Sequence, residues 1–253
     1  GGTFSSSPGL TIDVNTGAIT PSTSTAGNYT VTYTIPASAG CSATPVTTDV
    51  VITEVPTAAI SYAGTPFCTS ITTGEVVTLT GSAAFTGGTY SSTAGLTIDT
   101  NTGAITPSTS TAGNYTVTYT IPASGGCSAI PVTTDIVITQ EPTATITYAG
   151  SPFCISVTTA ETVTLNGTDA YTGGTFSSTV GLTIDANTGA VTPSTSTPGN
   201  YTVTYTIPAS GGCTAIPVTT DIVITQAPTA TISYAGSPFC ISVTTAETVT
   251  LNG

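Results

Sequence analysis

The chain has 253 residues and a net charge of −12, because it contains 12 Asp and Glu residues and no Lys, Arg or His. Without His or Lys it cannot build Ser-His-Asp, Cys-His, Ser-Lys or Schiff-base catalysis, and a hydrolytic zinc site would have only Cys and carboxylate ligands. Without a cation it cannot neutralise nucleic-acid phosphates or anionic lipid headgroups, so catalysis by paired carboxylates alone survives in principle, and we predict no enzyme.

The remaining composition favours a folded, strand-rich protein. Val, Ile, Leu, Tyr and Phe recur at regular intervals and Thr is the dominant polar residue, whereas disordered segments are poor in β-branched and aromatic residues. No run of 18 apolar residues occurs, so we predict no membrane span in this window. No signal peptide or sorting tail is visible and the chain starts in mid-pattern, so we expect a window cut from something longer.

A period of 86 residues organises the chain. "GGTF" at Gly1, "GGTY" at Gly87 and "GGTF" at Gly173 mark it, and two series of cysteines keep the same spacing. Differences between copies are mild, such as Phe85 against Tyr171, as a packed core demands. The junctions "ITEVPTA", "ITQEPTA" and "ITQAPTA" divide the chain into a partial module 1–55, whole modules 56–141 and 142–227, and a partial module 228–253.

Short strands follow one another through module 56–141. We predict strands near 57–62, 75–80, 88–92, 96–99, 103–106, 114–121 and 131–139. In "NYTVTYTI" (114–121), Tyr115, Val117, Tyr119 and Ile121 share one face and Thr residues the other, which indicates a half-buried antiparallel strand. The loop containing "SGG" predicts a hairpin to 131–139. Seven short strands with Gly, Pro and Asn turns predict an all-β fold of tandem immunoglobulin-like β-sandwich modules.

The segment "LTIDTNTGAIT" predicts a turn, with calcium as the alternative. Gly103 suits the left-handed position of a hairpin loop, and Asp99 and Asn101 suit capping of its backbone N–H groups. A calcium site needs six to eight oxygens, and this loop offers one carboxylate and one amide. We therefore predict no cofactor and no metal, and keep Asp99, Asn101, Asp185 and Asn187 as the only metal candidates.

The repeat also carries a resemblance. "GLTID.NTGAIT......GNYTVTYT" resembles the Ig-like motif of many bacterial surface proteins. The combination of "PFC" early and "GGC" late in each module is similar to the tandem repeats of giant cell-surface adhesins from gliding, Bacteroidota-type bacteria. The resemblance implies an outer-surface protein, transported by a dedicated secretion system that reads a C-terminal signal.

Two cysteines per module indicate disulfides and an oxidising compartment. Repeat symmetry allows two pairings: within a module (Cys68–Cys127 and Cys154–Cys213, with Cys41 and Cys240 bonded to partners outside the window), or across junctions (Cys41–Cys68, Cys127–Cys154 and Cys213–Cys240). Sequence alone does not decide between them. The resemblance favours the first pairing.

These features predict an extension device. Linkers containing Pro56, Pro142 and Pro228 restrict the hinge between modules, so neighbouring repeats are the first expected partners, with surface glycans or other filaments next. We predict a structural stalk or filament segment of an extracellular adhesin. The alternatives are a spacer of a secreted polysaccharide-degrading enzyme, a binding module for glycans or divalent ions, and a fibre subunit in which residues 228–253 complete residues 1–55 of the next chain.

Overall fold

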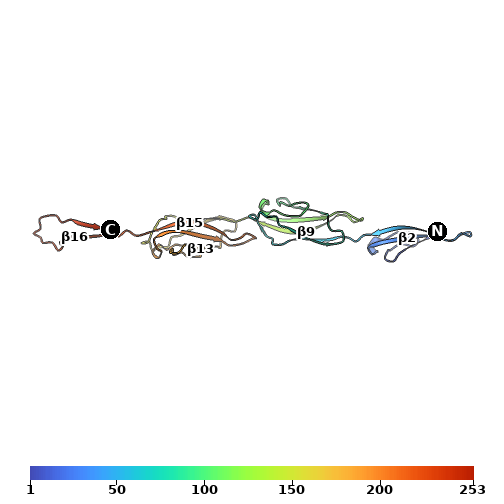
Figure 1. Ribbon diagram of the computed structural model, residues 1–253, viewed down its shortest axis with the longest axis horizontal. Helices are drawn as coiled ribbons and strands as arrows, with labels where there is room; N and C mark the ends of the chain where they lie inside the picture. Colours follow the sequence, from blue (N-terminus) through green and yellow to red (C-terminus); the bar gives the residue numbers. More distant parts are fainter. The chain divides into compact units, whose positions relative to one another are not determined.

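The computed structural model describes residues 1–253, and it is built from β-strands with no α-helix (Figure 1). It contains no helix that could span a membrane. By its internal contacts the chain divides into two compact units, Gly1–Thr139 and Gln140–Gly253. The module boundaries drawn from the sequence stay a prediction.

The first unit holds one partial and one nearly whole repeat. Its first sheet has the order β1-β2-β3, its second is the pair β4-β6, and its third has the order β5-β9-β8-β7. The bounds are β1 Thr3–Ser6, β2 Gly27–Ile35, β3 Thr44–Ile52, β4 Thr57–Tyr62, β5 Phe67–Cys68, β6 Val77–Ser82, β7 Thr89–Ser92, β8 Gly113–Ile121 and β9 Ile130–Thr139. Short 3-10 turns lie at Pro21–Thr23 (η1) and Pro107–Thr109 (η2).

The predicted hairpin is confirmed as β8 and β9. Its antiparallel register runs from Gly113 opposite Ile138 to Ile121 opposite Ile130. Tyr115, Val117, Tyr119 and Ile121 are buried, whereas the intervening Thr side chains are half-exposed. The alternation of apolar residues and Thr produces this pattern of burial, because successive side chains of a strand point to opposite faces.

The two sheets of residues 56–139 enclose one apolar core. Ile60 and Tyr62 of β4 pack with the inward residues of β8 and with Ile136 and Ile138 of β9. Full burial of such a side chain stabilises the fold by about 1.5–3 kcal/mol. The packed pair of sheets is the predicted β-sandwich.

A tyrosine hydrogen bond marks the sandwich as immunoglobulin-like. The Tyr115 hydroxyl donates to the Thr111 carbonyl at 2.7 Å, just before β8, and Tyr29 repeats the bond to Thr25. A tyrosine at the start of the penultimate strand that bonds the backbone a few residues upstream is a hallmark of this fold. The order β9-β8-β7 also matches its three-stranded face, so the predicted fold class is confirmed.

Strand β5 was not predicted from the sequence. Its two residues pair in parallel with β9, Phe67 opposite Ile138 and Cys68 opposite Thr139. The Thr69 N–H donates to the Thr139 carbonyl at 2.9 Å, and the Val137 N–H donates to the Thr65 hydroxyl at 3.1 Å. A strand of two residues is too short to show any periodicity.

The prediction of strands at 96–99 and 103–106 was wrong. Ile98 and Ile105 form one isolated antiparallel bridge, and Ile105 also bridges to Glu75. Beside the tight turn from Asp99 to Ala104, only one pair of residues forms a bridge, because the chain on both sides of that pair makes other contacts. Apolar alternation over four residues does not distinguish such a bridge from a strand.

The second unit repeats this topology in residues 142–225. Its sheets have the orders β10-β12 and β11-β15-β14-β13, and a further pair, β16-β17, follows. The bounds are β10 Thr143–Thr147, β11 Phe153–Cys154, β12 Thr164–Thr168, β13 Thr175–Ser178, η3 Pro193–Thr195, β14 Gly199–Ile207, β15 Ile216–Thr225, β16 Thr231–Tyr234 and β17 Val249–Asn252. Its core is formed by the equivalent residues.

The partial repeats have incomplete cores. In residues 1–55 only Leu10, Tyr29 and Val31 form a buried cluster. In residues 228–253 the large apolar side chains are exposed, including Ile232, Phe239 and Leu251. Their equivalents in the first unit, Ile60, Phe67 and Leu79, belong to the sandwich core.

Candidate functional site

The turn at Asp99 uses its carboxylate internally. Oδ1 of Asp99 accepts the N–H of Asn101 at 2.9 Å and of Thr102 at 2.7 Å. The Asp99 carbonyl accepts the Gly103 N–H at 2.8 Å, and Gly103 has φ of +73°, which glycine adopts without strain. The prediction that Asp99 caps the turn is confirmed, whereas Asn101 takes part through its backbone N–H and not through a capping side chain.

The same bonds set the charge state of the turn. The Thr102 N–H, and then the Asn101 N–H, hold the pKa of Asp99 below its ordinary value. Asp13 and Asp185 repeat the arrangement, with lowered pKa values from the same two bonds. Asn187 donates its backbone N–H to the Asp185 carboxylate, as Asn101 does to the Asp99 carboxylate. Each predicted metal candidate therefore has a defined part in a turn.

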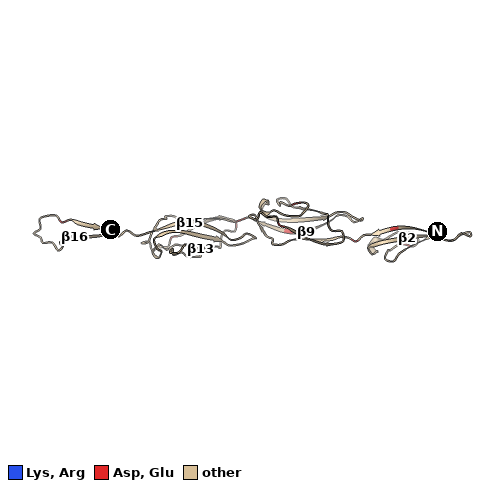
Figure 2. Ribbon diagram, viewed as in Figure 1, with Lys and Arg blue, Asp and Glu red and all other residues tan.

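The acidic residues are scattered over the chain, and the ribbon in Figure 2 has red segments but no blue ones. No three His, Cys, Asp or Glu residues lie together in an arrangement that could hold a metal ion. Asp135 illustrates the pattern: it lies on β9 and accepts a hydrogen bond from the Thr116 hydroxyl of β8 at 2.8 Å. One hydroxyl thus holds one carboxylate across the two paired strands.

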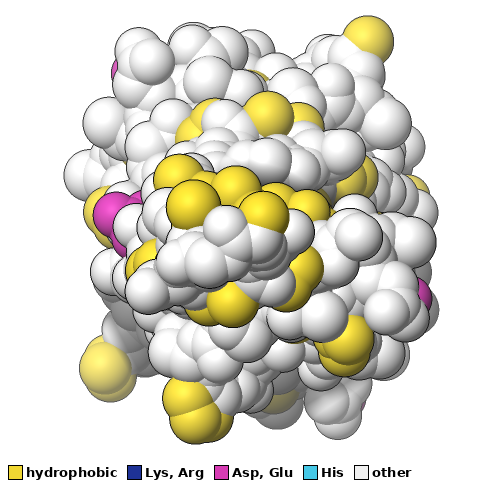
Figure 3. Space-filling view, turned by 90° about the vertical axis from the view of Figure 1, so that its right-hand side faces the viewer, with side chains coloured by type: hydrophobic (Ala, Val, Ile, Leu, Met, Phe, Trp, Pro, Cys, Tyr) yellow, Lys and Arg dark blue, Asp and Glu magenta, His cyan; other side chains and the backbone are white.

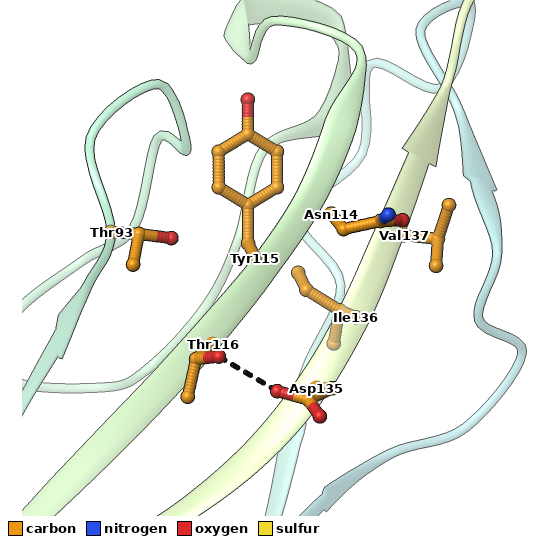
Figure 4. Close-up of a pocket in the computed structure, with 7 residues that line it drawn as sticks. All are labelled: Thr93, Asn114, Tyr115, Thr116, Asp135, Ile136 and Val137. Atoms are coloured by element: carbon orange, nitrogen blue, oxygen red, sulfur yellow. Dashed lines mark hydrogen bonds between the residues drawn. The ribbon is translucent and has the colours of Figure 1, made fainter.

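That pair lines a shallow hollow on the outside of the module. The hollow, of about 380 Å³, is lined by Thr93, Asn114, Tyr115, Thr116, Asp135, Ile136 and Val137. Figure 4 shows Thr116 and Asp135 pointing toward one another across the two strands. Amide, hydroxyl and carboxylate groups here could hydrogen-bond a hydroxyl-rich ligand.

The hollow recurs once per repeat. Thr30 and Asp49 lie in an equivalent hollow of about 350 Å³, and Thr202 and Asp221 in one of about 320 Å³. Both hydroxyl–carboxylate bonds are preserved, at 3.0 Å and 2.8 Å. Sequence reasoning missed these hollows, although the fixed spacing of Thr116 and Asp135 on paired strands could have indicated them.

The cysteines do not follow the predicted within-module pairing. Cys68 and Cys213 are disulfide-bonded, whereas Cys41, Cys127, Cys154 and Cys240 are free thiols. Neither Cys68–Cys127 nor Cys154–Cys213 is therefore formed. The junction bonds Cys41–Cys68, Cys127–Cys154 and Cys213–Cys240 are not formed either, because each includes a free thiol.

Topology explains why the within-module bonds fail. Cys68 lies opposite Thr139, at the end of β9, whereas Cys127 lies in the hairpin loop before Ile130, at its start. The length of β9 separates them by about 30 Å at the usual rise of a strand. A disulfide needs Cα atoms within about 7 Å.

The hairpin cysteine instead faces the preceding repeat. Cys127 Sγ lies 3.7 Å from the Thr53 hydroxyl oxygen and 4.0 Å from the Glu54 carbonyl. The Thr53 hydroxyl also donates to the Gly125 carbonyl. In the second unit, Cys213 Sγ lies 3.8 Å from the carbonyl of Gln140, the residue equivalent to Glu54. In the first unit, the hairpin loop is thus a contact at the joint between repeats.

The chain is similar to known proteins in structure and not in sequence. No protein-family model matches the chain, and no curated protein matches its sequence. Among solved structures, the chain is similar to the EC3–6 domains of protocadherin gammaB7 (TM-score 0.39, 11% identity, 93% of this chain and 69% of that one). It is also similar to the insect immune protein hemolin (0.33, 12%, 89% and 68%).

A third similar structure is a SusE-like, surface-located polysaccharide-binding protein from the heparin utilisation locus of Bacteroides thetaiotaomicron (0.29, 12%, 89% of this chain and 43% of that one). The fold assignment rests on the strand order and the tyrosine bonds given above.

Proposed function

We propose that the chain is a structural stalk or filament segment of a large, repetitive extracellular bacterial adhesin, and that it holds a distal functional region away from the cell surface. The joint between repeats carries the proposal. At Val55–Pro56 the chain passes directly from one repeat to the next, and the hairpin loop at Gly125–Cys127 contacts Thr53 and Glu54 beside it. Two contacts on one joint restrict bending more than a linker alone.

Proline reinforces this joint. Pro56 and Pro142 are buried, and the ring of proline fixes its own φ. Near-identical modules add length without adding new chemistry, which suits a stalk. The repulsion of a net charge of −12 also opposes unspecific association of neighbouring stalks.

Disulfide bonding of cysteines supports the extracellular placement. Cys68 and Cys213 are disulfide-bonded, and such bonds persist in oxidising compartments outside the cytosol. Gliding motility, which the resemblance suggests, belongs to this proposal as the process that the adhesin would serve. A non-catalytic role accords with the absence of Lys, Arg and His from the sequence.

A second candidate is weak, multivalent binding of glycans. The recurring hollows at Thr30, Thr116 and Thr202 favour it, because repeated weak sites on one chain raise the overall affinity. Isothermal titration with neutral oligosaccharides would test it. A variant that combines Asp135→Asn with its counterparts Asp49→Asn and Asp221→Asn should give no heat of binding.

Two measurements test the stalk. Antibodies against residues 56–141 should label the outside of intact cells, and the denatured, non-reduced native polypeptide should have a mass many times 24.8 kDa. Label confined to the cytoplasm would overturn the extracellular role. A catalytic module on the same polypeptide would favour the alternative of a spacer in a secreted polysaccharide-degrading enzyme.

A further inference from the structure

We propose that the chain is N-glycosylated once per repeat, at Asn28, Asn114 and Asn200, and that the first sugar lies in the hollow beside each asparagine. Such a sugar is a covalent part of the protein, whereas the glycan-binding candidate above concerns a ligand from outside. The inference rests on the extracellular placement proposed above, because the sequence pattern that accepts N-linked sugars is used in secreted proteins.

Each of these asparagines begins the acceptor pattern Asn-X-Ser/Thr. The triplet is Asn-Tyr-Thr in all three repeats, at residues 28–30, 114–116 and 200–202. Its middle residue is not proline, so the pattern is complete. Because the pattern is short, the place of the asparagine in the fold decides whether a sugar can be carried there.

The fold presents the asparagine and the threonine of the triplet on the outside of the sandwich. Asn114 and Thr116 are two residues apart on β8, so their side chains lie on the same face, while Tyr115 between them points into the core. Tyr115 is 7% exposed, and its hydroxyl donates to the Thr111 carbonyl. The buried tyrosine fixes the strand and leaves Asn114 exposed.

The side-chain amide of Asn114 makes no hydrogen bond within the protein, and neither do those of Asn28 and Asn200. All three asparagines are exposed. Substitution of a surface residue without such contacts usually changes the free energy of unfolding by no more than about 0.5 kcal/mol. Packing therefore does not explain why every repeat has asparagine at this position, whereas an attached sugar does.

The hollow described above begins at this asparagine. In each repeat the whole Asn-Tyr-Thr triplet lines it, together with the aspartate of the neighbouring strand. Figure 4 shows Asn114 beside Val137, its partner on β9, with Thr116 and Asp135 next to them. A sugar attached to the Asn114 amide therefore enters a space of about 380 Å³ that the acceptor triplet itself helps to line.

The lining favours a neutral sugar. One oxygen of the Asp135 carboxylate accepts the Thr116 hydroxyl, and the other can accept a hydroxyl of the sugar. Val137 is 36% exposed and can contact the apolar face of the ring. Figure 3 shows one face of the molecule, on which white atoms predominate and carboxylates occur without any cationic side chain. An acidic or sulfated sugar would be repelled by such a surface.

The attachment is a group transfer from a lipid-linked sugar diphosphate, carried out by a separate transferase. The amide nitrogen of Asn114 forms a bond to the anomeric carbon of the sugar, and the bond from that carbon to the diphosphate oxygen breaks. The diphosphate leaves with the electron pair of that bond. The amide nitrogen gives one proton to a base of the transferase, so nothing is oxidised or reduced.

The folded strand determines when this transfer takes place. In the folded module the Thr116 hydroxyl is bonded to Asp135, and Asn114 lies opposite Val137 in the β8–β9 ladder. A transferase that recognises the hydroxyl of the acceptor pattern needs the chain before this ladder forms. We therefore expect the sugar to be added during secretion, before the module folds.

A fourth match to the pattern, Asn166-Gly167-Thr168, provides a comparison within the same chain. It lies on β12, where the other whole repeat has Thr-Gly-Ser at residues 80–82. The Thr168 hydroxyl is hydrogen-bonded to the Thr143 hydroxyl at 2.8 Å, and Asn166 lines none of the three hollows. We expect no sugar at Asn166, because nothing beside it would hold one.

Peptide analysis of the native polypeptide tests the proposal. Antibodies against residues 56–141 collect it from the outer surface of cells, and it is reduced, alkylated and cut after Asp and Glu. Peptides 14–49, 100–135 and 186–221 then carry one acceptor asparagine each. We expect each to be heavier by whole sugar residues, with fragmentation placing the added mass on the asparagine of Asn-Tyr-Thr. The Asn-Thr-Gly asparagine of the same three peptides, and peptide 162–169 with Asn166, should be unmodified.

Matched variants produced in the native cells make the test specific. Thr116→Val should remove the added mass from peptide 100–135, whereas Thr116→Ser, which keeps the acceptor pattern, should retain it. In both variants peptides 14–49 and 186–221 should stay modified. Surface material with three unmodified peptides, or added mass that survives Thr116→Val, would overturn this proposal and leave the stalk proposal standing. Antibody label confined to the cytoplasm would overturn both.

Discussion

The thiol of Cys127 lies 3.7 Å from the hydroxyl of Thr53, although 74 residues separate them in the sequence. Thr53 directly follows β3 of the first repeat, and Cys127 belongs to the β8–β9 hairpin of the next. A hairpin loop that contacts the preceding repeat makes the joint a packed interface rather than a free hinge.

Thr53→Val should loosen this joint. The change removes the hydroxyl that donates to the Gly125 carbonyl, at a net cost of about 0.5–1.5 kcal/mol. Hydrogen exchange should therefore become faster at Gly125–Cys127, while the hairpin at Ser210–Cys213, which belongs to the other unit, keeps its rate. Equal acceleration of both hairpins would mean that Thr53 acts through global stability instead.

Neighbouring residues of β9 should respond differently to truncation. Ile136 is 1% exposed, so Ile136→Ala leaves a cavity and should lower the free energy of unfolding by about 2–5 kcal/mol. Val137, on the opposite face, is 36% exposed, and Val137→Ala should change the free energy of unfolding by no more than about 0.5 kcal/mol. Denaturant titration followed by circular dichroism measures both, and similar losses would contradict the assigned strand orientation.

Tyr119→Phe should be costly at a position where shape is preserved. The Tyr119 hydroxyl accepts from the Gly88 N–H and donates to the Phe85 carbonyl, each at 2.8 Å. Removing it leaves both groups without this partner, so we expect a loss of about 1–3 kcal/mol in thermal or denaturant unfolding. Tyr90→Phe is the control, because the other whole repeat carries Phe176 there, and it should be nearly neutral.

Alkaline pH should destabilise the modules through buried tyrosines. Burial raises the pKa of Tyr148 from 10.0 to about 12 and raises that of Tyr62 as well. The unfolded chain therefore releases these protons first, so stability is complete below pH 10.0 and falls as pH rises toward 12.

Melting temperatures measured from pH 8 to pH 12 check this expectation. Tyr148→Phe should flatten the part of the decline that comes from the second unit, whereas Tyr234→Phe, at a residue 49% exposed, should not. A melting temperature constant to pH 12 would show that the buried hydroxyls titrate normally.

The turn at Asp99 should respond to acid and to substitution, and not to calcium. The lowered pKa of Asp99 means that its contribution is present above the ordinary value of 3.8 and is lost as pH falls through the folded-state pKa. Asp99→Ala should lower the melting temperature at neutral pH, and Thr100→Ala, at an exposed side chain in the same turn, should not.

Calcium gives the complementary measurement. Because the Asp99 carboxylate already accepts two backbone N–H groups, millimolar calcium chloride should leave the melting temperature unchanged. An increase that disappears in Asp99→Asn would instead assign the loop to calcium binding.

The sequence by itself determined the repeat, the all-β class and the turn. Alternation in "NYTVTYTI" specifies a half-buried strand, and "DTNTG" supplies its own capping groups, because both signals act between residues close in the chain. Tertiary structure decided how the cysteines pair and whether β5 forms. Phe67 and Cys68 become a strand only against β9, about 70 residues away, and the length of β9 separates Cys68 from Cys127. Spacing in a sequence does not reveal which end of a sandwich a side chain occupies, since that depends on the direction of every strand between them.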